Sequence, residues 1–207
     1  IMNSNYLVLV RHGQSEWNEK NLFTGWENPG LTQKGEKEAK DAGKIINGLG
    51  INFDYLYTSA LIRAQLTGSI ILSEINQKNV NTIENKALNE RFYGDLQGLN
   101  KDECRKKWGD EKVQMWRRSY DRGPPGGETL KQTGERVVTY FREEIEPLVK
   151  NGSNILIAAH GNSLRSLIKF LDDVTDEDIV KLEIPTGAPI HYVFDSNGKV
   201  MQRNNLF

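Results

Sequence analysis

Two apolar segments of the chain end in the same way, and this pairing is the strongest constraint on the fold. LVLV (residues 7–10) runs into Arg11, His12 and Gly13, and ILIAA (residues 155–159) runs into His160 and Gly161. Four or five consecutive apolar residues between polar neighbours predict strands that are buried on both faces, as in parallel sheets. Because ligands of such sheets bind beyond the carboxyl ends of the strands, we expect both histidines at a ligand-binding edge.

The segments between these strands alternate between helical and extended patterns. Thr32 is the expected N-cap of a helix whose apolar residues recur at helical spacing, and Gly50 is expected to end it. Residues 54–59 and 81–84 are predicted strands, and residues 60–76 a helix between them. We expect this helix to turn one set of apolar side chains to the core, namely Ile62, Leu66, Ile70 and Ile71.

The second half of the chain continues the same alternation. A long helix is predicted over residues 129–150, bent or ended near Pro147, and another follows His160. Residues 190–194 and 199–203 flank Asn197-Gly198, which indicates an antiparallel hairpin. The expected fold is therefore α/β, with three layers in the order α/β/α and a mostly parallel sheet that carries an antiparallel edge strand.

Length and composition indicate how the chain is divided into domains. The 207 residues suit a single domain, which we place at 2–207 because Ile1 precedes Met2 and is expected to be foreign to the native chain. Residues 100–128 are irregular, charged and end in Gly and Pro, which indicates a basic, lid-like lobe at about 90–128.

The charge balance and the cysteine content exclude several classes of partner. Lys and Arg number 27 against 28 Asp and Glu, so no overall basic field favours nucleic acid or an anionic membrane. Cys104 is the one cysteine, and no apolar stretch is long enough for a signal sequence or a membrane span. We therefore expect a cytoplasmic protein whose anion-binding site is local.

The residues around the two histidines suit phosphoryl transfer. A neutral imidazole with a pKa of about 6.5 is a competent nucleophile, and Arg11 beside His12 should lower that pKa. The transition state spreads negative charge over three oxygens, for which Arg11, Arg63 and His160 are candidate partners. Backbone N–H groups after Gly13 and Gly161 are expected to add to an anion cradle. Glu90 is the candidate general acid and base.

Each of these interpretations has a simpler alternative. His12, His160 and Glu90 could bind a metal, but the spacings HxxxH, HxH and CxxC do not occur in the sequence, so we expect no metal. Lys101, Arg117 and Arg118 could form a solvated face, and Glu90 could simply pair with Arg91. His191 is expected to pack within the hairpin, and Cys104 to be an ordinary thiol.

Several motifs of the chain resemble those of the cofactor-dependent phosphoglycerate mutases of the histidine phosphatase superfamily. They occur in the family's order, and the resemblance spans nearly the whole chain. RHG alone is typical of the superfamily, whereas the later motifs are closer to the mutase branch. The matching segments are RHGQSEWN (11–18), Arg63, ERFYG (90–94), GLNK (98–101), WRR (116–118), HGNSLR (160–165) and IPTG (184–187). The chain departs from longer mutases between residues 118 and 129, where they carry an insertion.

The resemblance implies an enzyme that interconverts 3-phosphoglycerate and 2-phosphoglycerate, primed by 2,3-bisphosphoglycerate and independent of metal. It implies that His12 carries the phosphoryl group, that Arg11, Arg63 and His160 hold its oxygens, and that Glu90 moves the proton. Further substrate contacts are implied for Asn18, Thr24, Gly25, Tyr93, Lys101, Arg117, Arg118, Gly161 and Asn162. The family also suggests a homodimer.

Two other functions stay open at the level of sequence. A phosphatase would use the same His12 but transfer the phosphoryl group to water. A catalytically silent module of the same fold would only bind phosphorylated ligands or partner proteins. Lys101 and the pair Arg117-Arg118 favour the mutase over the phosphatase, and the intact set of catalytic residues argues against the silent module.

Overall fold

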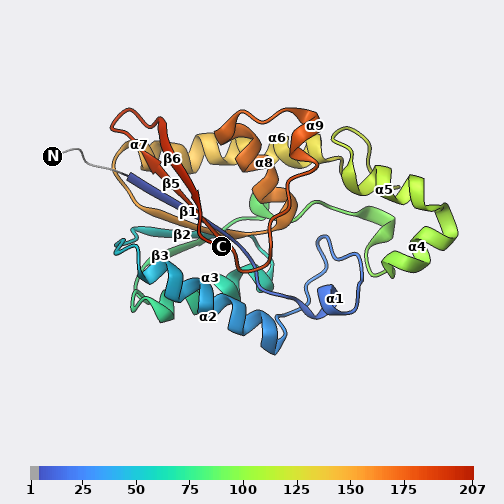
Figure 1. The fold of residues 1–207 in the computed structure, drawn as a ribbon, viewed down its shortest axis with the longest axis horizontal. Helices are drawn as coiled ribbons and strands as arrows, with labels where there is room; N and C mark the ends of the chain where they lie inside the picture. The colour runs from blue at the N-terminus through green and yellow to red at the C-terminus, as the bar shows by residue number, and fades with distance from the viewer. Residues whose placement is uncertain (1–4) are drawn as a thin grey trace.

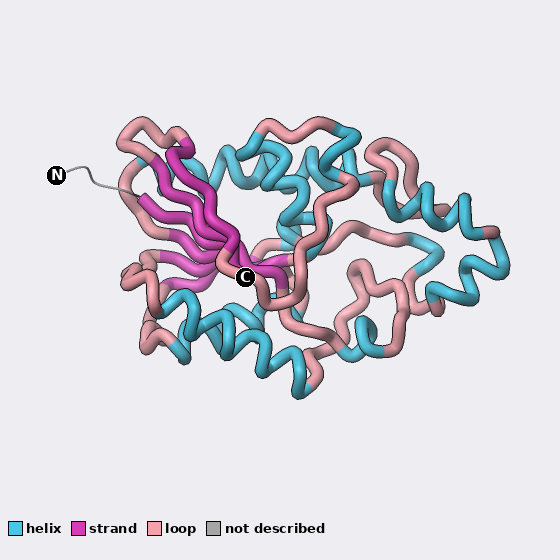
Figure 2. Tube along the Cα trace, viewed as in Figure 1, coloured by secondary structure: helices cyan, strands magenta, loops and turns pink. Residues whose placement is uncertain are grey.

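The centre of the molecule is a six-stranded sheet, seen in a computed structural model that describes residues 5–207. The strand order is β3-β2-β4-β1-β5-β6. Strands β1 to β4 run parallel, and β5 and β6 form an antiparallel pair at one edge. This confirms the predicted sheet, whose twist is visible in Figure 2. The expectation about residue 1 lies outside the described residues.

Strand bounds agree closely with the apolar runs of the sequence. They are β1 (Asn5–Arg11), β2 (Tyr55–Thr58), β3 (Asn81–Glu84), β4 (Ile155–Ala159), β5 (Pro189–Phe194) and β6 (Val200–Asn205). All five residues of β4 are buried, and Leu7 to Val10 of β1 are fully buried. Because β1 and β4 are neighbours in parallel register, the ends of the two strands, at Arg11 and Ala159, are paired with each other.

Helices cover both faces of the sheet, which confirms the three-layer architecture (Figure 1). Helices α2 (Gln33–Asn47) and α3 (Ile62–Glu74) pack on one face through Ala42, Ile46, Ile71 and Leu72. The other face is covered by α6 (Leu130–Tyr140), α7 (Glu146–Lys150) and α8 (Gly161–Asp172). Within residues 5–207, no helix has both the length and the apolar character needed to cross a membrane.

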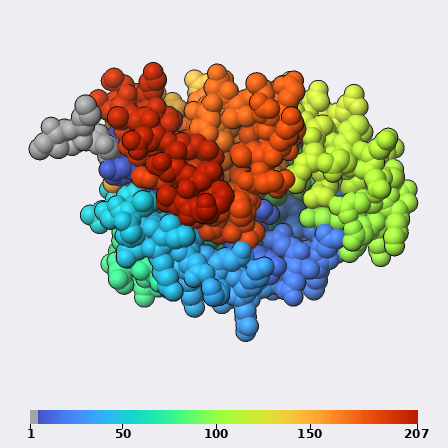
Figure 3. Space-filling model, viewed as in Figure 1, coloured from blue at the N-terminus to red at the C-terminus, as the bar shows by residue number. Residues whose placement is uncertain are grey.

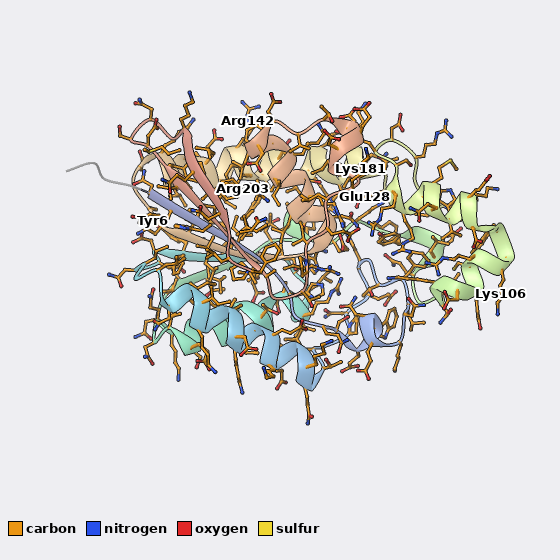
Figure 4. All side chains as sticks on the ribbon, viewed as in Figure 1. Tyr6, Lys106, Glu128, Arg142, Lys181 and Arg203 are labelled. Carbon is orange, nitrogen blue, oxygen red and sulfur yellow. The ribbon has the colours of Figure 1, made fainter. Side chains whose placement is uncertain are left out.

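The lobe predicted at about 90–128 contains α4 (Lys101–Trp108) and α5 (Asp110–Arg118), which extend away from the sheet in Figure 1. These helices have a small core of their own, formed by Phe23, Leu96, Cys104, Val113 and Trp116. Figure 4 labels Lys106 on α4, near the outer end of this lobe. Two short helices complete the list, α1 (Glu16–Glu19) and α9 (Asp176–Ile179).

The predicted core face of α3 is wrong for Ile62 and Leu66, which are 38% and 37% exposed, and is confirmed for Ile71, which is buried. Arg63 and Thr67, which were not predicted to face the core, are also buried. This helix has apolar residues on more than one side, so their spacing alone does not select a face. The face that packs inward is the one with small or hydrogen-bonded side chains, since Thr67 Oγ1 donates to the Arg63 carbonyl at 2.8 Å.

One helix end also differs from the expectation. Helix α2 ends at Asn47 rather than next to Gly50, because the N–H groups of Gly48, Leu49 and Gly50 each donate to the carbonyl three residues earlier. The helix predicted over residues 129–150 is confirmed in its bounds, and of the two expectations for Pro147 the ending of the helix there is wrong. A π-helical segment over Phe141–Ile145 precedes the proline, and the helix continues to Lys150, since the wider turn accommodates the missing N–H.

Candidate active site

A polar pocket lies beyond the carboxyl ends of β1 and β4, where the lobe meets the rest of the molecule. In Figure 3 the yellow-green lobe adjoins both the blue N-terminal segment and the orange C-terminal segment. The pocket brings together residues from separate parts of the chain, and all of the predicted site residues except His160 line it. They are Arg11, His12, Asn18, Thr24, Gly25, Arg63, Glu90, Tyr93, Lys101, Arg117, Arg118, Gly161 and Asn162.

His12 follows β1 directly and is 3% exposed. Its Nδ1 lies 2.6 Å from the carbonyl oxygen of Gly13, and a carbonyl can only accept, so Nδ1 carries the proton. Nε2 is therefore the unprotonated nitrogen, with its lone pair available. Burial, followed by the positive charges of Arg63 and Arg11, lowers the pKa of His12 well below its ordinary value of 6.5. The ring is neutral at pH 7 and can act as a nucleophile.

His160 lies beside His12, with ring centroids 5.1 Å apart. Its Nε2 is 2.7 Å from Ser59 Oγ, and its buried Nδ1 has no hydrogen-bond partner among residues 5–207. Burial first, then the charges of Arg63, His12 and Arg11, lowers its pKa well below 6.5. Nδ1 is thus the ring atom available to an oxygen of a ligand.

Two guanidinium groups flank the histidines. Arg11 Nη1 donates to the Ile184 carbonyl at 2.7 Å, and the two terminal nitrogens of Arg63 donate to the carbonyls of Gly25 and Glu27. Their Nε atoms are buried and have no partner within the described residues 5–207. An anionic ligand would satisfy such donors, because a buried guanidinium without a counter-anion is costly.

Glu90 reaches the pocket from an irregular segment and is held by backbone groups. Its Oε1 accepts from the N–H of Arg91 at 2.8 Å and from the N–H of Asn162 at 3.0 Å. The carbonyl of Glu90 accepts from Trp26 Nε1 at 2.7 Å and from Arg136 Nη2 at 2.8 Å. The carboxylate is therefore fixed in place at the edge of the pocket. It is not a simple ion-pair partner of Arg91.

A second group of cations comes from the lobe. Lys101 and Arg117 lie over the Phe23 ring, at 5.6 and 5.9 Å from its centre. Burial, followed by the neighbouring charge of Arg117, lowers the pKa of Lys101 to about 8. Tyr93 packs on the same ring at 5.2 Å, and its hydroxyl accepts from Asn162 Nδ2 at 3.2 Å. These contacts place the lobe's cations in the pocket rather than on a solvated face.

The anion cradle expected after Gly13 is wrong. The N–H of Gly13 donates to Thr67 Oγ1, that of Gln14 to Glu38 Oε1, and that of Ser15 to Asn18 Oδ1. These backbone donors are consumed in fixing the segment that follows the nucleophile. After Gly161, the N–H of Asn162 is likewise used, on Glu90.

Sequence reasoning missed several residues that line or support the site. Arg165 and Glu183 line the pocket, and Ser59 contacts His160. Arg136 donates to the carbonyls of Ala87, Asn89 and Glu90 and also pairs with Glu128, which is labelled in Figure 4. The HGNSLR segment contained Arg165, so its helical position five residues after His160 was a usable signal. Nothing in the local sequence marked Glu183.

Comparison with known proteins agrees with this geometry. The model of the histidine phosphatase superfamily, branch 1, matches residues 7–206. The chain belongs to this superfamily. A protein of Parvibaculum lavamentivorans named 2,3-bisphosphoglycerate-dependent phosphoglycerate mutase is 59% identical over 202 residues, which is 98% of this chain and 96% of that protein. The phosphoglycerate mutase of Schizosaccharomyces pombe is 56% identical over 199 residues, 96% of this chain and 94% of that one.

Solved structures of the superfamily share the fold at lower identity. The α-ribazole phosphatase of Shigella flexneri superposes with a TM-score of 0.83 and 23% identity, covering 98% of this chain and 96% of that chain. This likeness concerns the fold alone. Within the superfamily, the sequence relatives of this chain are named mutases, and its resemblance to the mutase branch is confirmed.

Proposed function

We propose that this protein is a 2,3-bisphosphoglycerate-dependent phosphoglycerate mutase that interconverts 3-phosphoglycerate and 2-phosphoglycerate. The observation that carries the proposal is the division of the pocket into two cationic parts. Arg11 and Arg63 surround the neutral His12, and Lys101, Arg117 and Arg118 line the part formed by the lobe. A phosphoglycerate has two anionic groups and needs both parts. The names of the relatives that are 55–59% identical support the same activity.

The first half of the reaction takes place at His12. Nε2 attacks the phosphorus, an N–P bond forms, and the P–O bond to the leaving oxygen breaks. Arg11, Arg63 and His160 donate to the oxygens of the transferred group. In the transition state, negative charge is spread over these three oxygens. The Gly13 carbonyl holds the proton on Nδ1 and stabilises the positive charge that develops on the ring when Nε2 becomes bonded.

Glu90 acts as the general acid and base. When the P–O bond breaks, its carboxylic acid protonates the leaving oxygen; in the reverse step, the carboxylate removes a proton from the attacking hydroxyl. General acid–base catalysis of this kind contributes about 10²–10⁴ to the rate. Lys101, Arg117 and Arg118 hold the glycerate carboxylate and the second phosphate meanwhile.

The residues present fit 2,3-bisphosphoglycerate. In the described part of the chain, the buried Nε atoms of Arg11 and Arg63 are donors without a protein partner, and the Nδ1 of His160 also has no partner. When bound, this cofactor supplies the phosphoryl group that primes His12. No group of three or more metal-binding side chains occurs in residues 5–207, and we propose that the reaction proceeds without a metal ion.

We further propose a single domain over residues 2–207 in which the lobe at about 90–128 acts as a lid. Its cations reach the substrate, and the small core of α4 and α5 is separate from the two cores that flank the sheet, so we propose that the lobe moves and excludes water from the phosphorylated histidine. We place the enzyme in the cytoplasm, with phosphoglycerates as partners and without nucleic acid or membrane binding.

An assay of both products tests the proposed activity. Purified protein is supplied with 3-phosphoglycerate, with or without a trace of 2,3-bisphosphoglycerate, and 2-phosphoglycerate and free phosphate are followed. Isomerisation that requires the trace cofactor is expected. Replacement of His12 by Ala should abolish turnover and acid-labile phosphate on the protein, whereas His191→Ala, outside the site, should retain both.

Other outcomes of this assay would contradict the proposal. Dominant release of phosphate would indicate a phosphatase, and neither product would indicate a silent binding module. Inhibition by EDTA that a divalent ion reverses would mean that the site uses a metal.

We also propose that two copies of the protein associate through the β3 edge. Ile62 and Leu66 on α3 are large apolar side chains that are 38% and 37% exposed, and β3 is an edge strand of the sheet. Burying them against a second copy would remove apolar surface from water. Light scattering after size exclusion should give the mass of a dimer, and Leu66→Lys should give the monomer; a monomeric parent protein would contradict this proposal.

A further inference from the structure

Glu183 is an acidic side chain in a pocket built for anions. It lies in the loop between α9 and β5 and lines the pocket near the lobe. Its Oε1 is 3.2 Å from Arg118 Nη2, and its Oε2 is 3.6 Å from Arg165 Nη2. A carboxylate of the protein thus bridges one guanidinium from the lobe and one from α8.

The fold does not need this carboxylate. The Glu183 side chain is 69% exposed, and an ion pair with that exposure contributes little to stability. Arg165 already has other partners, because its Nε donates to the Leu182 carbonyl at 2.7 Å and its Nη1 to Asn162 Oδ1 at 3.0 Å. The main physical consequence of Glu183 is therefore its negative charge at the pocket.

That charge opposes ligands in proportion to their own charge. A phosphate ester has a second pKa of about 6 and carries nearly two charges at neutral pH, so 3-phosphoglycerate carries about three negative charges and 2,3-bisphosphoglycerate about five. The lining residues in the described chain include the cations Arg11, Arg63, Lys101, Arg117, Arg118 and Arg165, which attract both ligands. Glu183 reduces this attraction, and reduces it more for the more highly charged ligand.

We infer that Glu183 is a specificity-determining residue that weakens the binding of bisphosphorylated glycerates more than that of monophosphorylated ones. The inference rests on the proposed mutase function. Glu90, the other carboxylate that we place in the pocket, is fixed by two backbone N–H groups and serves proton transfer. Glu183 instead pairs with two guanidinium groups, and a ligand anion that binds Arg118 must displace it or share the cation with it.

Isothermal titration calorimetry tests the inference. The titrations use the full chain with His12→Ala, which cannot be phosphorylated at that position, with and without Glu183→Gln. The Glu183→Gln change should lower the dissociation constant of 2,3-bisphosphoglycerate about five-fold and that of 3-phosphoglycerate about two-fold. These effects are in the range expected for a partly exposed charge pair. Both gains should shrink at about 0.5 M salt, where screening is strong.

Two further variants separate charge from folding and geometry. Glu183→Asp retains the charge and should retain the ratio of the two dissociation constants. Glu146→Gln removes an ion-paired glutamate on α7, outside the pocket, and should change neither constant. Thermal unfolding should give nearly the same Tm for Glu183→Gln as for its parent, since the side chain is exposed.

The outcomes that would overturn the inference are distinct. Weaker binding of both ligands in Glu183→Gln would mean that Glu183 positions Arg118, and equal tightening of both would mean that its charge does not discriminate between them. If the parent bound neither phosphoglycerate, the proposed function would fail and this inference with it, whereas normal binding with an unchanged ratio would overturn the inference alone.

Discussion

The position of Lys101 can set the pH range over which the pocket binds substrate. Burial, and then the neighbouring Arg117, lowers the pKa of this lysine to about 8. A neutral amine cannot pair with a carboxylate or a phosphate. The affinity of the pocket for substrate should therefore be highest below about pH 7 and should decline as the pH rises through 8.

Replacement of Lys101 by Arg should remove this alkaline decline. Arginine stays charged throughout the range, so the KM for 3-phosphoglycerate should stay nearly constant, whereas in the unmodified enzyme it should rise about ten-fold by about pH 9. Steady-state kinetics between about pH 7 and pH 9 measure this difference. Parallel rises in both proteins would show that another group controls substrate affinity.

At the scale of elements, the segment after His12 is positioned by close backbone contact with α2. A Cβ on Gly35 would lie 2.1 Å from the Gln14 carbonyl oxygen, and a Cβ on Gly13 would lie 2.1 Å from the Gly35 carbonyl oxygen. Only glycine at both positions permits this approach. The helix and the loop that carries the nucleophile therefore form one rigid unit.

Gly35→Ala should destabilise the protein by about 1–3 kcal/mol, because backbone atoms must move apart to admit the methyl group. Gly134→Ala is the matched control within a helix. Its Cβ would lie 3.5 Å from Ser166 Oγ and 3.7 Å from Ser166 Cβ, which are ordinary contacts, so the better helix propensity of Ala should stabilise the protein by about 0.5–1 kcal/mol. Urea unfolding measures both, and equal effects would contradict the proposed contact.

The strands and helices also differ in how well the sequence could predict them. The strands β1 and β4 were recognisable because both faces of each are buried, so the apolar run is uninterrupted. The sequence predicted that His12 and His160 share the ligand-binding edge, and the pairing of β1 with β4 in the structure brings the two rings together. The inward face of α3 was not predictable, since its spacing of apolar residues offered two faces and the choice depended on packing of Arg63 and Thr67 against distant loops.

Long-range side-chain contacts account for the rest of what was missed. Glu38 bonds the N–H of Gln14 and the hydroxyl of Thr186, and Arg136 holds the carbonyls around Glu90. These partners are 24 to 148 residues apart in sequence. Neither periodicity nor local motif encodes such pairs, so the supporting residues of the site emerge only from the folded arrangement.

For the molecule as a whole, the neutral histidines link stability to pH. His12 and His160 have folded-state pKa values well below 6.5, mainly through burial, whereas in the unfolded chain they titrate near 6.5. Below that pH the unfolded state binds more protons than the folded state. Stability is therefore fully present above about pH 7 and is lost as the pH falls through 6.5 towards the lowered values.

The free energy of unfolding should fall with a slope approaching about 1.4 kcal/mol per pH unit for each of the two histidines. Urea denaturation between about pH 7.5 and pH 5 measures this. The double variant His12→Asn, His160→Asn should have a much shallower slope. His191→Asn should reduce the slope less, because burial also lowers the pKa of His191 but this side chain is only half-buried. A flat profile for the unmodified protein would contradict the assignment of both rings as neutral.

The place of β1 in the sheet has a consequence for motion. This strand is bordered by β4 on one side and β5 on the other, and His12 is the first residue after it. The nucleophile cannot shift unless the most deeply embedded hydrogen-bond ladders part, which happens only when the whole chain melts. Any movement that admits a ligand to His12 should therefore occur on the side of the pocket away from the sheet, where Lys101 and Arg117 lie.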